Sequence, residues 1–180
     1  GDNWYDGEPL RPIRLNSAAA NRSRPQLSTT AGASGMGGLI VRDFTPTFYG
    51  TGVTGAPTYA ADGQTGVALR DGPRVEFSIR MAITAKGGIG GPVRIGNLPW
   101  ASDNFANLTY SCAVGNVSGF TGSTDSFGIQ AFINNTSSDV VLQESIGGSA
   151  SSLVQDSQIS DSFRIDISGW YLVDDGVVIV

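Results

Sequence analysis

The chain has 180 residues, of which 40% are apolar and 15% charged, and its formal net charge is −5. Histidine is absent and Cys112 is the single cysteine, which excludes Ser-His-Asp and Cys-His catalysis, histidine-ligated metals, an internal disulfide and cysteine-built metal clusters. The acidic balance argues against partners such as nucleic acid or an anionic membrane, and no apolar run reaches the roughly 18 residues of a membrane-spanning helix.

The composition favours β-structure. Glycine occurs 25 times, roughly twice its usual share, and lysine occurs once, as Lys86. A chain rich in Gly, Ser, Thr, Val and Ile lacks the residues that most favour helices. Its length suits one domain with a hydrophobic core. We therefore expect an all-β protein.

Residues 1–42 differ from the rest of the chain. They carry five arginines and three acidic residues, a net charge of +2, whereas residues 43–180 carry six basic and thirteen acidic residues, a net charge of −7. A solvated, disordered tail is one interpretation of this composition. Its aromatic and aliphatic residues favour the other, an extended arm that lies on a neighbouring subunit or docks into a larger assembly. The candidate interface residues in this arm are Trp4, Tyr5, Ile13 and Leu15.

Strands follow one another from Phe44 onward. In residues 74–84, positions 75, 77, 79, 81 and 83 are apolar and the positions between them are mostly polar, which predicts a strand with one buried face. Residues 163–168 repeat this pattern. Further strands are expected at residues 127–133, 140–146 and 170–173, and a short apolar run ends the chain at 177–180.

Turn sequences separate these strands, among them Asp62-Gly63, Asp71-Gly72-Pro73 and Asn134-Asn135. No segment after residue 43 has a helical period. Short strands with turns at this spacing are typical of sandwiches. The predicted fold is an antiparallel, jelly-roll-like β-sandwich over residues 43–180, preceded by the extended arm over residues 1–42.

The sequence offers little for catalysis. Cys112 alternates in phase with Leu108, Tyr110 and Val114, so we expect a buried, apolar role for it rather than a nucleophile. A glycosidase needs two carboxyl groups placed across a bond. Glu76 and Glu144 occupy polar positions of predicted strands, and several aspartates lie in predicted loops. We interpret all of these residues as solvated surface acids. We expect no enzyme activity, no cofactor and no metal site.

Three segments carry a resemblance to a known class of protein. Residues 44–50 (FTPTFYG) open the domain, residues 91–100 (GPVRIGNLPW) follow the long alternating strand, and residues 163–172 (FRIDISGWYL) lie near the end. This order resembles the C-terminal domains of bacteriophage tail fibres and related virion appendages, over roughly residues 43–175. In such proteins a compact β-sandwich closes a fibre or spike, usually as a homotrimer.

The resemblance implies a structural protein of the virion, assembled in the host cytoplasm and involved in attachment to the host surface. It implies self-association as a homotrimer and contacts with other virion proteins through the arm. Exposed apolar residues near the C-terminus suit the subunit interface, although an ordinary core strand explains them as well. These candidates are Trp170, Tyr171, Val177 and Ile179.

Polar loops on a rigid β-scaffold are the usual places for recognition. We expect residues 115–126 and 134–139 to form such loops. Trp100 follows a proline at the end of a strand, where it can cap the core or meet a partner. The candidate contacts with a cell-surface polysaccharide or protein are Trp100, Phe120, Thr121, Ser123, Asn134 and Asn135.

Two other functions remain open. A capsid decoration or head-fibre protein suits the arm equally well. A carbohydrate-binding module that works as a monomer is the alternative of another class. Exposed Trp100 and Trp170 favour the module, whereas burial of both in a threefold interface favours the appendage.

Overall fold

The computed structural model describes residues 38–105, 108–122, 126–147 and 150–174. They contain no α-helix and a single 3₁₀ turn, η2, at Asp156–Gln158. The ten strands are β1 (Ile40–Phe44), β2 (Thr47–Gly50), β3 (Thr58–Asp71), β4 (Arg74–Ala85), β5 (Val93–Gly96), β6 (Thr109–Phe120), β7 (Ser126–Asn134), β8 (Val140–Ile146), β9 (Ser152–Leu153) and β10 (Ile159–Leu172). The prediction of an all-β fold is confirmed.

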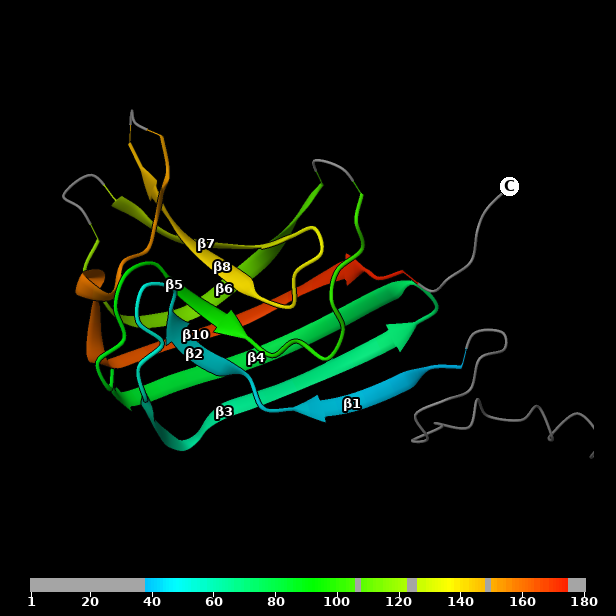
Figure 1. Cartoon of the computed structure of the whole chain (residues 1–180), viewed down its shortest axis with the longest axis horizontal. Coiled ribbons are helices and arrows are strands. Elements are labelled where there is room, and N and C mark those ends of the chain that lie inside the picture. The colour runs from blue at the N-terminus through cyan, green and yellow to red at the C-terminus, as the bar shows by residue number, and fades with distance from the viewer. Residues whose placement is uncertain (1–37, 106–107, 123–125, 148–149, 175–180) are drawn as a thin grey trace, which may run out of the picture.

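The strands form one antiparallel sheet that curls onto itself. Its order is β1-β3-β4-β10-β6-β7-β8-β5-β2, with β9 paired to β8. Figure 1 shows β1, β3, β4 and β10 as one layer and β5, β7 and β8 as the layer facing it. The predicted sandwich therefore exists as two halves of a continuous sheet.

Strict alternation builds the core of the first layer. Val75, Phe77, Ile79, Met81 and Ile83 of β4 are all less than 5% exposed, and the intervening residues point outward. The inward residues of β10 do the same from the neighbouring strand, because β4 and β10 pair in register along their length. The alternation read from the sequence thus assigned the inward residues of both strands correctly.

Aromatic side chains join the two layers. Phe48 of β2 and Phe163 of β10 are both buried, and their rings stack with centroids 5.5 Å apart. These strands belong to different halves of the sheet. The contact is thus one of the places where the sandwich is held closed.

Strand β6 turns the corner between the layers. Its first residues pair with β7, from Thr109 opposite Asn134 to Cys112 opposite Ala131. From Ala113 onward β6 pairs with β10 instead, and the register shifts where Asn116 adopts a φ of 48°. Such a bulge bends a strand, so β6 leaves β7 and joins the other layer.

Several boundaries differ from the prediction. The turn expected at Asp62-Gly63 is instead an irregularity in the pairing of β3 with β4. Glycine is required there, because a Cβ atom at residue 63 would lie 2.4 Å from the Ala82 carbonyl oxygen. Residues 115–120 are the second half of β6 rather than a loop, because pairing with β10 compensates for their weak strand propensity. Residues 170–172 form the end of β10 rather than a separate strand, and β1 begins at Ile40, inside the expected arm.

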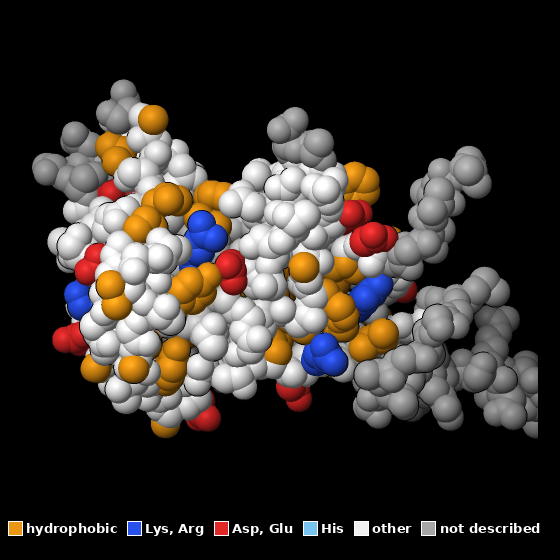
Figure 2. Space-filling view, in the orientation of Figure 1, with side chains coloured by type: hydrophobic (Ala, Val, Ile, Leu, Met, Phe, Trp, Pro, Cys, Tyr) orange, Lys and Arg blue, Asp and Glu red, His pale blue; other side chains and the backbone are white. Residues whose placement is uncertain are grey.

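The described part of the chain has no helix long and apolar enough to cross a membrane. Charged side chains are sparse on the face in Figure 2, and they are scattered there rather than gathered into a block of one sign. The rest of the arm, residues 1–37, lies outside the described residues.

Candidate receptor-contact site

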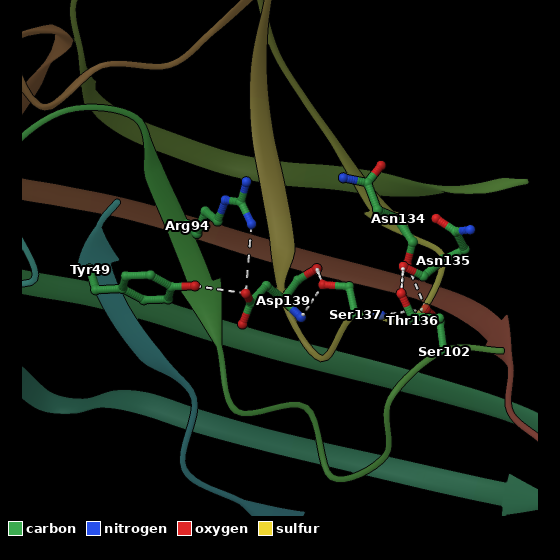
Figure 3. A network of polar contacts seen from close by, with 8 residues as sticks. All are labelled: Tyr49, Arg94, Ser102, Asn134, Asn135, Thr136, Ser137 and Asp139. Carbon is green, nitrogen blue, oxygen red and sulfur yellow. Dashed lines mark hydrogen bonds and ion pairs between the residues drawn. The ribbon is translucent and has the colours of Figure 1, made fainter. Parts of the chain in front are cut away.

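Two loops meet at the end of the sandwich where β5 and β7 finish. Residues 97–105 follow β5, and residues 135–139 connect β7 to β8. Ser102, which is 4% exposed, joins them: its hydroxyl donates to the Asn134 carbonyl oxygen and accepts from the Ser137 amide at 3.0 Å. The Ser102 amide donates to the Ser137 carbonyl oxygen at 2.9 Å. Figure 3 shows this clamp, which fixes one loop against the other.

Asp139 ties the same hairpin to strands β2 and β5. The Tyr49 hydroxyl donates to Asp139 Oδ2 at 2.7 Å, and Arg94 Nη1 lies 3.8 Å from the same oxygen (Figure 3). Burial, and then the neighbouring Asp139 carboxylate, raise the pKa of Tyr49 to about 12. The phenol therefore stays protonated and keeps donating at neutral pH.

Folding stability is expected to fall as the pH rises from 10 to 12. The Tyr49 phenol has an ordinary pKa of 10.0 and a pKa of about 12 in the folded chain. Above pH 10 the unfolded chain loses this proton while the folded chain keeps it, so stabilisation that is complete below pH 10 is lost through this window. Urea midpoints measured between about pH 8 and about pH 12 should fall less steeply for Tyr49→Phe. Equal slopes for the two proteins contradict the assignment.

Trp100 stands at the open edge of the sandwich. Its half-buried ring packs against the core, and its carbonyl oxygen accepts a hydrogen bond from the Tyr171 hydroxyl at 2.9 Å. The guanidinium carbons of Arg42 in β1 and Arg70 in β3 lie 5.3 and 5.7 Å from the ring centroid. Cation–π contact therefore fixes the indole between the loop and the edge of the sheet.

A pocket of about 380 Å³ opens beside this ring. We call it the Trp100 pocket; the side chains that offer ligand contacts are Arg70, Trp100, Asp103, Asn104, Thr136 and Asp174. The Asn135 amide donates to the Asn104 side-chain oxygen at 3.3 Å. An aromatic ring beside a planar amide, two carboxylates and a guanidinium suits a ligand that has both apolar faces and hydroxyl groups. A sugar has that chemistry.

Backbone strain occurs in both loops. Asn97 has a φ of 73° and Thr136 a φ of 54°. The left-handed region is unfavourable for a β-branched residue such as threonine. The Thr136 amide donates to the Asp103 carbonyl oxygen at 3.3 Å, so the facing loop holds this conformation at the rim of the Trp100 pocket.

The structure divides the predicted receptor contacts between two ends of the molecule. Trp100, Asn134 and Asn135 lie in or beside the two clamped loops. Phe120 and Thr121 lie at the far end of β6, where the Thr121 amide donates to the Gln158 carbonyl oxygen. Ser123 lies outside the described residues. Thr136 lies in the recognition loop predicted at residues 134–139, whereas Arg70, Asp103 and Asn104 were not predicted. The polar pair Asp103-Asn104, shortly after Trp100, was a signal for two of them.

The predicted interface residues also separate. Trp170 is 46% exposed on the outer face of β10, with the Arg74 guanidinium 5.3 Å from its ring centroid. Tyr171 is completely buried and packs against Phe77 and Tyr110, which corrects its assignment to the interface. Strand alternation puts these neighbours on opposite faces. The other candidates, Trp4, Tyr5, Ile13, Leu15, Val177 and Ile179, lie outside the described residues.

One carboxyl group is not where the sequence suggested. Glu144 is 1% exposed rather than solvated, and it accepts a hydrogen bond from the Gln158 side-chain amide at 2.6 Å. Gln158 belongs to η2, which covers this end of β8. Glu76, by contrast, is exposed and pairs with Arg74 at 2.9 Å, as expected for a surface acid. The alternation of polar and apolar residues could not show that η2 packs over Glu144.

Cys112 is expected to react slowly with alkylating reagents. Burial raises the pKa of its thiol from 9.0 to about 12, so very little thiolate exists near neutral pH. Labelling by iodoacetamide near pH 8 should be at least ~100-fold slower in the folded chain than in denaturant, by this loss of thiolate. Mass spectrometry over a time course measures both rates. Similar rates in the two conditions contradict the buried, apolar role.

Comparisons with known proteins support the fold. No protein family matches the chain, and no curated protein is significantly similar to it. The crystal structure of the Dettilon tailspike protein (gp208) is similar, with a TM-score of 0.61 and 19% sequence identity. The similarity covers 74% of this chain and 23% of that one, so the chain spans less than a quarter of the tailspike's length. The resemblance to phage tail appendages, read from three segments, is thereby confirmed as a likeness of fold.

Proposed function

We propose that this chain is a structural protein of a bacteriophage virion, a domain of a trimeric tail fibre or spike that takes part in attachment to the host surface. The fold that it shares with part of a tailspike is the observation that supports this proposal. The Trp100 pocket supplies a surface suited to a cell-surface polysaccharide. The domain acts by binding and performs no catalysis.

The chain assembles with itself as a homotrimer and contacts other virion proteins through its N-terminal arm. Trp170 supports self-association, because its side chain is 46% exposed on the outer face of β10 and aromatic residues are enriched at interfaces. Residues 40–172 form a sandwich. That its strands are connected as in a jelly roll remains a prediction. A capsid decoration or head-fibre protein is the second possible location in the virion.

A carbohydrate-binding module is the second candidate function, because the Trp100 pocket suits it equally well. The two functions differ in assembly, since the module works as a monomer. Both predict that a sugar binds, so glycan binding tests what the domain recognises and oligomeric mass tests which function it serves.

The recognition part of the proposal is tested on an array of bacterial surface polysaccharides. The full chain, labelled at its amino groups, is expected to be retained on a subset of the glycans. Excess unlabelled chain should compete for the same spots. Failure to bind any polysaccharide while the chain is folded contradicts a role in glycan attachment.

A further inference from the structure

Strands β6 and β7 diverge after Cys112 and Ala131, and we call the opening between residues 113–118 of β6 and residues 129–130 of β7 the fork. The ladder between them ends at Cys112 opposite Ala131, and the next potential pairs, Ala113 with Gln130 and Val114 with Ile129, do not form. Beyond this point β6 pairs with β10, whereas Ile129 and Gln130 of β7 pair with β8. On the fork side, no described strand pairs with residues 113–118 of β6. Backbone groups of a strand edge are therefore available there.

The fork is hollow and uncharged. A groove of about 600 Å³ lies at the point of divergence, and its lining includes Ser111, Cys112, Val114, Ile129, Gln130 and Phe132. Cys112, Val114 and Ile129 are partly buried side chains that pack against the core. A segment placed between the strands would thus find polar backbone groups on its sides and apolar side chains beneath it.

The strand edges in the fork lack the usual protection. Natural sheets guard free edges with charges, prolines or very short strands. β1 carries exposed Arg42 and Asp43, and β2 has only four residues and follows Pro46. β6 and β7 have 12 and 9 residues and no charged side chain. Long, uncharged edges beside an apolar groove are what an added strand requires.

We propose that the fork binds an extended segment around Ile13 and Leu15, from the N-terminal region of a second copy of this chain, as an added β-strand. This inference rests on the self-association in the proposed function and names where the arm binds. The 37 residues before the described region supply the segment. Ile13 and Leu15 alternate with Arg14 and Asn16, a pattern that puts two apolar side chains on the groove floor.

Charge and reach agree with this occupant. Residues 1–37 carry a net charge of +1, from four arginines and three acidic residues, and residues 38–180 a net charge of −6, from seven basic and thirteen acidic residues, so the segment is attracted to the body of another copy. The 23 residues that follow Leu15, up to and including Gly38, can extend over roughly 76 Å. The fork is separated from β1, where the segment joins its own sheet, by β3, β4 and β10 (Figure 1). The N-terminal segment of a neighbouring copy can enter the fork without first crossing β3, β4 and β10 of the chain to which it belongs.

Hydrogen exchange of the full chain, followed by mass spectrometry, tests the proposal. At tens of micromolar chain, the amides of residues 113–118 that point away from β10 should exchange at least ~10-fold more slowly than in the variant Ile13→Asp/Leu15→Asp, because they donate to the added strand. The matched control, Leu27→Asp/Thr29→Asp, places the same charges at the same spacing and should keep the protection. Dilution that dissociates the assembly should abolish it.

Each alternative result overturns the proposal in a distinct way. Equal exchange in the Ile13→Asp/Leu15→Asp variant and the unchanged chain shows that this segment does not fill the fork. Protection that persists in a monomer, as measured by light scattering, assigns the strand to the same chain instead. A trimer with unprotected fork amides refutes this inference and leaves the proposed function standing, whereas an unprotected monomer refutes both.

Discussion

Replacing Phe163 by alanine is expected to lower the free energy of unfolding by about 3–5 kcal/mol. The Phe163 side chain is completely buried and stacks on Phe48 at 5.5 Å. Alanine would leave a cavity between the two layers and remove one of the contacts that hold the curled sheet closed. Urea denaturation followed by tryptophan fluorescence measures the change.

Two further variants make this test specific. Val67→Ala removes an apolar side chain that is 41% exposed, so it should change stability by less than about 0.5 kcal/mol. Phe163→Leu keeps most of the buried volume and should cost less than Phe163→Ala. A loss below about 1 kcal/mol for Phe163→Ala would mean that the layers are not packed together at this point.

Replacing Trp100 by alanine is expected to reduce binding to the retained polysaccharides at least ~10-fold, since a buried aromatic contact is worth more than 1 kcal/mol. The change removes the ring beside the Trp100 pocket and frees Arg42 and Arg70, whose guanidinium groups lie 5.3 and 5.7 Å from its centroid. Trp100→Phe should bind with intermediate affinity. Biolayer interferometry on the immobilised glycan gives the affinities.

The controls separate binding from folding. Val67→Ala removes an apolar side chain that is 41% exposed and does not line the Trp100 pocket, so it should leave the affinity unchanged. Asn104→Ala alters an exposed residue of the pocket that is not part of the core, so it should weaken binding without lowering stability. Full affinity in both Trp100→Ala and Asn104→Ala contradicts the assignment of the pocket.

Local periodicity accounts for what the sequence predicted well. The alternation in β4 and the inward face of β10 follow from the two-residue period of a strand, and a buried face makes that period visible. β8 was expected at residues 140–146 and has those bounds. Such signals depend only on neighbours in the chain.

Features that depend on distant segments were missed. Residues 115–120 looked like a loop, because their strand conformation comes from pairing with β10 about 50 residues later. Burial of Glu144 requires η2 to fold over β8, and no local pattern reveals that. The Trp100 pocket likewise draws Arg70, Asp103 and Thr136 from three separate segments. Tertiary placement, rather than propensity, decided each of these outcomes.

The absolute mass of the full chain in solution tests the central claim most directly. Light scattering behind a sizing column, at two concentrations of the chain, distinguishes a trimeric appendage from a monomeric binding module. The account predicts three times 18.7 kDa at the higher concentration. A mass of 18.7 kDa at both concentrations contradicts the trimeric appendage and favours the carbohydrate-binding module.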